Sequence, residues 1–407
     1  MSYAPVELLT VYLDAGGRLK AGRLAVSNRQ ILFEYDAAFL ASGTQISPLM
    51  LPLKPGVLVS PDTMFDGLFG VFNDSLPDGW GRLLLDRTVE KHGINRRQLT
   101  PLDRLAYVGS RGMGALRYEP DRSTTMPDDA PLALDRLAEE AAIVLAGENE
   151  EVFDELLRLN GSSAGARPKI VAQVNAGRNK ISHGAQALRA GYEHWMIKFP
   201  SSQDARDAGK VEYAYSLMAK DAGVEMPETH LFPAKKSRGY FGARRFDRVG
   251  DARVHMHSLS GLIHADHRHP SLDYDTILRV ALLLTRNVVE VEKVYVLACF
   301  NVLAHNRDDH AKNFSFLLTE RNEWVFAPAY DLTFSYGPGG EQSTMVMGEG
   351  KQPGVTQLRA LDKKHGLKRA PEILERVTQA VLHWKRHAEC AGVSARSTKA
   401  IAAKIAV

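Results

Sequence analysis

The sequence predicts an α+β fold in which two β-rich parts precede a helical part. Residues 7–75 alternate strand-like runs with turns that contain Gly, Pro and Asp. A second β-rich stretch begins at Gly161, and from about Gly250 onward apolar residues recur almost wholly at helical spacing. This order predicts an N-terminal subdomain, a β-rich lobe and a helical lobe, over residues 1–121, 132–248 and 249–407.

Each element follows from a local pattern. We expect the first strands at 8–13 and 30–35, and a turn within 69–81 that leads into a helix at 82–92. A linker rich in Ser, Thr, Pro and Asp over 122–131 precedes a helical stretch. That stretch and the later elements are expected as helices at 132–159, 211–222, 274–285, 288–305 and 371–388, and as strands at 169–174, 194–199 and 239–246.

Composition sets broad limits. The chain has 407 residues, of which 44% are apolar and 24% charged, as in an ordinary globular protein. Its net charge of +3 is too small to indicate nucleic-acid binding from the field alone. The two cysteines, Cys299 and Cys390, form no disulfide framework. There is no signal-peptide pattern and no apolar stretch of the ~20 residues that span a membrane, so we expect a cytoplasmic protein without a membrane partner.

The segment from Asn306 to Phe314 carries the strongest chemical signal. Asp308 and Asn313 have the spacing of the protein-kinase catalytic loop, and a second carboxylate, Asp331, follows a strand-like run. Phosphoryl transfer from ATP needs a carboxylate that orients the attacking hydroxyl. It also needs an amide and a carboxylate that hold magnesium. The competing interpretation is that such residues only cap or turn the chain after a helix.

Residues beside this pair favour a site. His310 is suited to orient Asp308, and Lys312 to neutralise phosphate charge. Arg307 also matches the kinase loop, whereas Asn306 stands where His is usual and Asp-Phe-Gly is absent. The pattern predicts a divergent, two-lobed protein-kinase-like fold, with a β-rich N-terminal lobe, an extra N-terminal subdomain and an all-helical C-terminal lobe.

Two further segments carry lysines. Residues 161–169 form a small-residue loop before a strand, where backbone amides can approach phosphate and Lys169 adds a charge. Alone, such a loop is equally an ordinary turn. Lys198 lies in a strand among bulky apolar residues, where it either reaches ATP phosphates or extends to water from an edge strand. Glu212, near the start of the next helix, is a candidate partner for Lys198.

Basic residues mark two other places. Arg244, Arg245 and Phe246 lie where the β-rich pattern gives way to the helical one, which is the place of an interlobe hinge that binds adenine. A basic strand end at the surface explains them equally well. A second basic cluster at 363–369 is either a solvated helix face or a contact for DNA phosphates.

Taken in order, these motifs resemble the HipA kinases, the toxin components of bacterial type II toxin–antitoxin modules. The resemblance covers nearly the whole chain. It includes the Asp-Ser-Leu-Pro-Asp-Gly-Trp-Gly turn at 74–81, the phosphate loop at 162–169 and the lysine strand at 194–200. It continues through the hinge at 245–248, the catalytic loop at 306–315 and the pair Tyr330-Asp331. At the hinge, Arg244 replaces the usual Glu.

The resemblance implies a serine/threonine kinase with Asp308 as catalytic base, Asn313 and Asp331 as magnesium ligands, and Lys198 on the ATP phosphates. It also implies autophosphorylation at Ser162 that switches the enzyme off, with Ser163 as a neighbouring candidate. The implied nucleotide-binding set is Ala164, Gly165, Ala166, Arg167, Pro168, Lys169, Lys198, Arg244, Arg245, Phe246, His310, Ala311, Lys312, Asn313, Tyr330 and Asp331.

The implied partners are a helix-turn-helix antitoxin like HipB, an aminoacyl-tRNA synthetase as protein substrate, and operator DNA reached only through the antitoxin. Two alternatives remain from the sequence. One is a kinase-inactive co-repressor that acts through an antitoxin on DNA. The other is a kinase that phosphorylates a small molecule or lipid.

Overall fold

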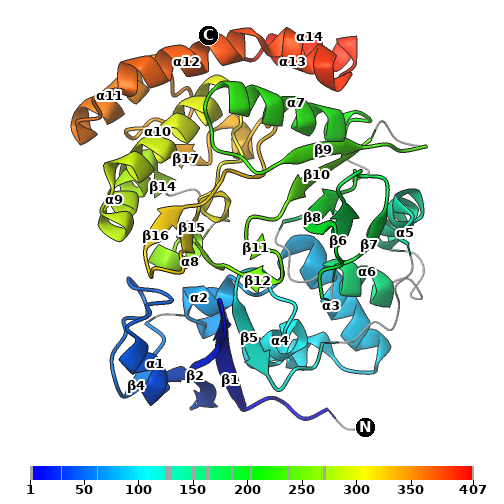
Figure 1. Ribbon diagram of the computed structural model, residues 1–407, viewed down its shortest axis with the longest axis vertical. Coiled ribbons are helices and arrows are strands. Elements are labelled where there is room, and N and C mark those ends of the chain that lie inside the picture. Colours follow the sequence, from blue (N-terminus) through cyan, green and yellow to red (C-terminus); the bar gives the residue numbers. More distant parts are fainter. Residues whose placement is uncertain are drawn as a thin grey trace.

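A computed structural model describes residues 3–28, 30–61, 63–123, 131–147, 153–160, 165–184, 187–201, 204–235, 239–266, 268 and 272–405. Figure 1 shows three parts: an N-terminal domain at the bottom, a second β-sheet to one side and a mainly helical part at the top. Each part has an apolar core of its own. In the described part, no helix is both long and apolar enough to cross a bilayer.

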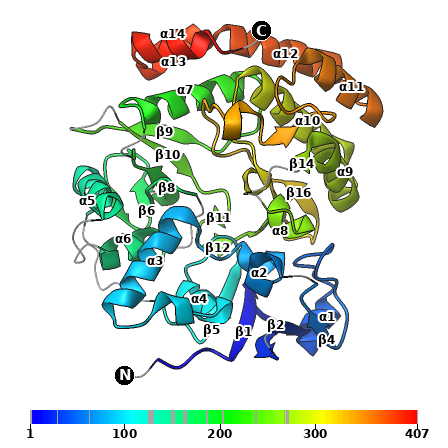
Figure 2. The same cartoon turned by 180° about the vertical axis from the view of Figure 1, so that it is seen from behind.

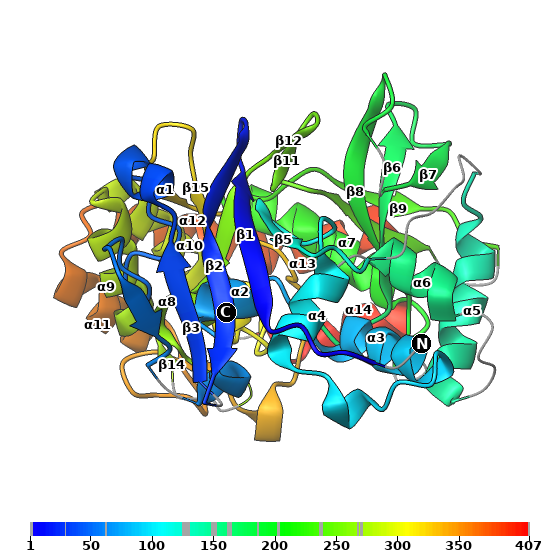
Figure 3. The same ribbon diagram turned by 90° about the horizontal axis from the view of Figure 1, so that it is seen from below.

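The N-terminal domain is built on an antiparallel sheet of order β4-β3-β2-β1-β5, seen from below in Figure 3. The strands expected at 8–13 and 30–35 are β1 and β3, whereas β2 and β5 were not predicted. An extra residue at Ala21 makes two successive residues of β2 face the core, and this bulge breaks the alternation that marks a strand. The elements are β1 (Leu8–Asp14), β2 (Arg18–Ser27), β3 (Gln30–Tyr35), α1 (Ala37–Ser42), β4 (Val57–Val59), α2 (Gly70–Asn73), α3 (Gly79–Lys91), α4 (Pro101–Val108) and β5 (Leu116–Glu119).

The second part contains an antiparallel sheet of order β7-β6-β8-β10-β9 with α5 and α6 beside it (Figure 2). Helix α3 of the N-terminal domain also packs here, because Trp80 and Leu84 join its core. The stretch expected as one helix at 132–159 is interrupted: α5 ends before Gly147, whose φ of +84° suits a glycine cap. The elements are α5 (Leu134–Ala146), α6 (Phe153–Asn160), β6 (Lys169–Asn175), β7 (Ile181–His183), β8 (Tyr192–Lys198), α7 (Ala208–Asp221), β9 (Thr229–Phe232), β10 (Tyr240–Arg244), β11 (Arg248–Val249) and β12 (Ala252–Arg253).

The last part is mainly helical but also carries short strands, which differs from the all-helical lobe that we expected. Strands β13, β15 and β16 form a small antiparallel sheet, and β14 pairs with β17. Strand β15 is buried on both faces, so it lacks the alternation that identifies a strand. The elements are β13 (His255–Ser258), α8 (Leu259–Ile263), β14 (Leu272–Asp273), α9 (Tyr274–Thr285), α10 (Val288–Leu303), β15 (Ser315–Leu318), β16 (Trp324–Phe326), β17 (Thr344–Met345), α11 (Val355–His365), α12 (Ala370–Leu382), α13 (Trp384–Ala391) and α14 (Ala395–Ala402).

Helix α7 connects the two lobes. It precedes β9 in the chain, yet Ala214, Tyr215 and Met218 belong to the core of the helical lobe, and Figure 1 shows α7 beneath α13. The helices expected at 211–222, 274–285 and 288–305 are confirmed as α7, α9 and α10. The one expected at 371–388 is divided at His383 into α12 and α13.

Candidate active site

Two lysines face the same side of the second sheet. Lys169 on β6 pairs directly with Lys198 on β8, so their side chains project from the same face of the two strands. Like charges in this arrangement repel each other, and Lys169 is also buried, with 4% of its surface exposed. Burial lowers the pKa of Lys169 to about 8. A sheet accepts such a pair when carboxylates or a bound anion offset the charge, which makes this face a candidate phosphate site.

Carboxylates from two other elements meet Lys198. Its ammonium group contacts Glu212 on α7, and its Nζ lies 2.5 Å from Oδ1 of Asp331. Burial opposes the charge on Lys198, but Asp331 and Glu212 outweigh that effect and raise its pKa. In turn, Lys198 holds the pKa of Asp331 far below its usual range. The proposed partnership of Lys198 with Glu212 is thus present, and it joins the sheet, α7 and the segment after β16.

Asp308 and Asn313 lie on the loop between α10 and β15. Asn313 Nδ2 donates to the carbonyl oxygen of Asp308 at 2.6 Å, so the amide closes the loop around the acid. Asp308 keeps access to solvent. Partial desolvation raises the pKa of its carboxyl, His310 lowers it in part, and Asp331 raises it.

Asp309, to which the sequence assigned no role, anchors the loop from beneath. It is 1% exposed, and it accepts hydrogen bonds from the Tyr274 hydroxyl at 2.6 Å and the Thr344 backbone N–H at 3.1 Å. Burial raises the pKa of Asp309 to about 7. Asn301 donates to Tyr274 Oη at 2.9 Å and accepts from Asn306 at 2.9 Å, which extends the support to the start of the loop. Asp308 is therefore presented on a rigid backbone.

Lys312 and the phosphate loop meet at a residue of the N-terminal domain. Lys312 Nζ lies 2.6 Å from Oδ2 of Asp78, and the other oxygen of Asp78 accepts the backbone N–H of Gly165. A Cβ on Gly165 would stand 2.4 Å from Lys169 Nζ, so the loop passes directly over that lysine. Lys312 thus has a carboxylate partner that the sequence did not reveal.

The predicted hinge is held firmly in the sheet. The backbone N–H groups of Arg244 and Arg245 donate to the carbonyl oxygens of Glu228 and His194 at 2.8 Å each. Any adenine contact from this segment must therefore be made by other backbone groups. The Arg244 side chain is exposed and lies 2.7 Å from Glu193. Phe246 contacts Tyr330, with ring centroids 5.8 Å apart.

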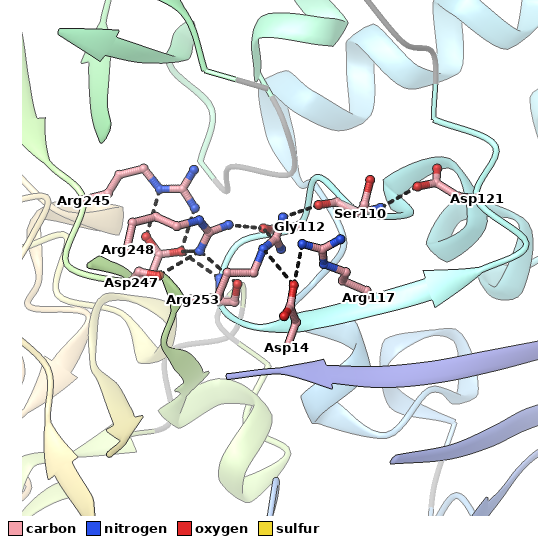
Figure 4. A network of polar contacts seen from close by, with 10 residues as sticks. Asp14, Ser110, Gly112, Arg117, Asp121, Arg245, Asp247, Arg248 and Arg253 are labelled. Carbon is pink, nitrogen blue, oxygen red and sulfur yellow. Dashed lines mark hydrogen bonds and ion pairs between the residues drawn. The ribbon is translucent and has the colours of Figure 1, made fainter. Parts of the chain in front are cut away.

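Figure 4 shows how the residues after the hinge connect to the N-terminal domain. Asp247 forms ion pairs with Arg245 at 2.7 Å and Arg248 at 2.8 Å, and Arg248 also donates to the carbonyl oxygen of Gly114 at 2.9 Å. Burial opposes the charge on Asp247, but Arg245 and Arg248 lower its pKa. Arg245 is buried in this network, so it serves the structure of the junction.

Of the remaining predicted residues, Ala166, Arg167, Pro168, Ala311 and Tyr330 lie in the described ranges. Ser162 and Ala164, with Gly161 and Ser163, lie outside the described residues. Arg167 Nη2 lies 2.9 Å from Asp204, and Pro168 accepts a hydrogen bond from the Phe199 N–H at 2.8 Å. Tyr330 donates to the Lys312 carbonyl at 2.6 Å. Ala311 is buried on the loop that carries Asp308, and Ala166 is exposed on the phosphate loop.

The donor set suits magnesium bound together with a nucleotide. Within the described ranges there is no cluster of three or more His, Cys, Asp or Glu side chains arranged for a metal. Magnesium at phosphoryl-transfer sites needs only one or two protein ligands, because phosphates and water supply the rest. Asp331 offers a carboxylate, and Asn313 offers Oδ1, since its Nδ2 already serves Asp308. The residues present therefore fit the metal that the kinase-like pattern implies.

Comparisons with known proteins identify the family of the chain. The HipA-like C-terminal domain matches residues 161–385, and the HipA N-terminal domain matches residues 9–119. The putative kinase Y4dM of Sinorhizobium fredii (strain NBRC 101917 / NGR234) is 25% identical over 65% of this chain and 63% of its own length. The putative kinase Y4mE of the same strain is 26% identical over 71% of this chain and 69% of its own length. The matches therefore span about two thirds of these curated relatives.

Among solved structures, the fold is similar to that of the toxin HipA of Shewanella oneidensis MR-1, determined in complex with HipB and its operator DNA. The TM-score is 0.69 and the identity 20%, over 98% of this chain and 96% of that chain. That likeness concerns the fold, whereas the domain match covers more than half of the sequence. The chain belongs to the HipA family.

Proposed function

We propose that this chain is an ATP- and magnesium-dependent protein serine/threonine kinase of the HipA toxin type. The observation that carries the proposal is the ion-paired group Lys198, Glu212 and Asp331, with Nζ of Lys198 2.5 Å from Asp331. Asp308 and Asn313 lie on the neighbouring loop and contribute to the same electrostatic environment. A strand lysine, its helix glutamate, a metal carboxylate and an acid–amide loop are the parts that phosphoryl transfer uses.

Each residue of this group would then have a role in phosphoryl transfer. Lys198 and Lys169 would bind the phosphates of ATP, and Asp331 and Asn313 would hold magnesium, which supplies positive charge against the phosphate oxygens. Asp308 would orient the acceptor hydroxyl and take its proton. The hydroxyl oxygen forms a bond to the γ-phosphorus while the bond from that phosphorus to the ADP oxygen breaks. The raised pKa of Asp308 suits it to receive that proton.

Substitution of Asp308 tests this proposal. We expect Asp308→Ala to lower the transfer of labelled phosphate from ATP to protein by at least about a hundredfold, while the thermal unfolding midpoint stays close to that of the wild type. Asp221→Asn is a matched control, because Asp221 is a surface residue that pairs with Arg386 on the far side of α7. Phosphate incorporation that is equal in Asp308→Ala and the wild type would reject the assignment.

The partners belong to the same proposal. The Shewanella HipA is found with HipB and operator DNA, and this supports a HipB-like helix-turn-helix antitoxin as partner, with DNA reached through it. We further propose that the protein substrate is a translation component, an aminoacyl-tRNA synthetase, and that Ser162 is an autophosphorylation site. Mass spectrometry after a reaction with cell lysate tests both, because phosphate must appear on a synthetase and on the peptide that contains Ser162.

A kinase-inactive co-repressor is a second candidate, favoured by the operator DNA in the structure of the related toxin. The two functions differ in what the ATP site does. A kinase should be stabilised by ATP with magnesium, by about 2.7 kcal/mol at a ligand concentration a hundred times its Kd. A thermal shift assay that shows no stabilisation at saturating ATP and magnesium would favour the co-repressor.

A further inference from the structure

One short segment of the N-terminal domain, residues 70–81, touches both lobes of the kinase-like part. We call it the brace. At its first end it is held against α8. A Cβ on Gly70 would stand 2.1 Å from the carbonyl oxygen of Gly261, so the two backbones are in direct contact. Helices α2 and α8 also lie side by side in both Figure 1 and Figure 2. The brace therefore begins on the helical lobe.

Asp74 strengthens this first contact. Its carboxylate accepts the Ser258 backbone N–H at 2.7 Å and the Ser258 hydroxyl at 2.6 Å. It also accepts from His257 Nδ1 at 2.6 Å. Three hydrogen bonds to one partly buried carboxylate fix the brace to the turn between β13 and α8. The next residues of the brace thus extend from a fixed point.

At its second end the brace meets the phosphate loop. The Trp80 N–H donates to the Gly165 carbonyl at 3.1 Å, and Asp78 accepts the Gly165 N–H, so both polar groups of Gly165 are held by the brace. Between them, Gly79 has a φ of +44°, and a Cβ there would lie 2.7 Å from the Gly165 oxygen. This approach of two backbones admits only glycine.

The Asp78 carboxylate also reaches the catalytic loop, because its second oxygen lies 2.6 Å from Lys312 Nζ. Gly165 belongs to the phosphate loop and Lys312 to the loop that carries Asp308, so one side chain from outside the kinase-like part joins both. The Lys312 side chain is 11% exposed and that of Asp78 24%, so water screens this ion pair only in part.

We propose that Asp78 is a positioning residue of the phosphoryl-transfer site, contributed by the N-terminal domain. It fixes the backbone of the phosphate loop with one oxygen and the Lys312 ammonium with the other. This inference rests on the proposed kinase function. Phosphoryl transfer depends on groups held within about 0.5 Å, and the brace supplies that constraint across two loops that belong to different lobes. The N-terminal domain is then part of the enzyme and does not serve only to bind a partner.

Two substitutions separate the two contacts of Asp78. Asp78→Asn keeps an oxygen that can accept the Gly165 N–H but loses the charge that holds Lys312. Asp78→Ala loses both contacts. We expect Asp78→Ala to raise the KM for ATP and to lower kcat, each by about tenfold, since each lost contact is a charge-assisted hydrogen bond. We expect Asp78→Asn to lower kcat alone.

Amide hydrogen exchange gives a readout that does not require activity. Exchange on peptic peptides that contain Gly165 should accelerate in Asp78→Ala and stay near the wild-type rate in Asp78→Asn. Asp86→Asn is the matched control. Asp86 lies on α3 and forms a part-buried ion pair with Arg104 of α4 at 2.6 Å, within the N-terminal domain. Its loss should lower stability without changing KM, kcat or exchange at Gly165.

The outcomes are distinct. Wild-type KM and kcat in Asp78→Ala would overturn the positioning role, and so would an equal loss of activity in Asp86→Asn, which would mark a general loss of stability. A wild-type protein that transfers no phosphate would overturn the proposed function. In that case the exchange experiment alone tests whether Asp78 fixes the phosphate loop. An unchanged exchange rate at Gly165 in Asp78→Ala would reject that role.

Discussion

Glu212→Gln is the substitution whose effect follows most directly from the structure. Glu212 is 3% exposed and contacts the Lys198 ammonium, whose other partner is Asp331 at 2.5 Å. The two carboxylates thus share one cation. Glutamine keeps the size and one hydrogen-bond acceptor but loses the charge. Lys198 is then drawn more fully to Asp331, which is the proposed magnesium ligand.

The size of the effect follows from the difference between a charged and a neutral hydrogen bond. A bond to a charged group contributes about 1.5–3 kcal/mol and a neutral one about 0.5–1.5 kcal/mol, so the change is about 1–1.5 kcal/mol. That free energy corresponds to about a tenfold change in an equilibrium constant. We expect the magnesium concentration for half-maximal activity to rise about tenfold at saturating ATP, because Asp331 becomes a poorer ligand.

A magnesium titration of phosphate transfer measures this directly. Glu290→Gln is the matched control, since Glu290 is a 5% exposed glutamate that pairs with Lys293 at 2.9 Å on α10, away from the lysine pair. We expect no change in its magnesium dependence. An unchanged half-maximal concentration in Glu212→Gln would refute the reasoning, as would a shift of the same size in Glu290→Gln.

Three further predictions concern other groups. Because the pKa of Lys169 is about 8, the KM for ATP should rise as pH increases from 7 to 9.5, and Lys169→Arg, which stays charged, should remove this rise; a parallel rise in the variant would contradict it. The pKa of Asp309 is raised to about 7, so between about pH 4 and 7 the folded state binds one proton more than the unfolded state. The stabilisation that this bound proton gives to the folded state is lost as pH rises through 7. Urea unfolding should therefore show a smaller fall in stability between pH 5 and 8 for Asp309→Asn than for the wild type, and equal falls would count against it. Gly79→Ala should raise the KM for ATP, because the added Cβ would push the Gly165 backbone away. Gly93 has a φ of +76° and open space around it, so Gly93→Ala should carry a similar backbone cost of about 1–2 kcal/mol without raising the KM. Equal KM values in the two variants would contradict the role of the contact between Gly79 and Gly165.

Local spacing explains why parts of the candidate site were predictable. Asp308 and Asn313 lie five residues apart on one loop, and the Asn313 amide donates to the Asp308 carbonyl within that loop. Lys198 lies in a strand whose apolar neighbours identify it. The pairing of Lys169 with Lys198 is different, because it depends on β6 and β8 being neighbours with β7 on the outside. No pattern within either strand carries that information.

Residues that act across the fold were not predictable in the same way. Asp309 looks like a turn residue after a helix, and its role depends on Tyr274 and Thr344, each 35 positions away. Asp78 looks like part of a tight turn, and its partner Lys312 lies 234 positions further on. The short strands of the helical lobe were not predicted from the sequence for another reason. A four-residue strand that is buried on both faces, such as β15, has no period that distinguishes it from a helix.

The charges of the site suggest which form of the nucleotide it accepts. In the part of the chain that the structure describes, four cations line it (Lys169, Lys198, Arg167 and Lys312), and Arg167 lies 2.9 Å from Asp204 and 3.9 Å from Glu212. Five carboxylates face them: Asp78, Asp204, Glu212, Asp308 and Asp331. The lysines are therefore largely neutralised within the protein, and free ATP with its several negative charges meets no surplus of positive charge. On the proposed function, Asp331 would hold a magnesium ion beside Lys198, and that ion would supply two positive charges against the phosphates. On the proposed function, the site would therefore bind the magnesium complex of ATP in preference to ATP alone. The carboxylates that neutralise the lysines would be the same groups that make the metal necessary.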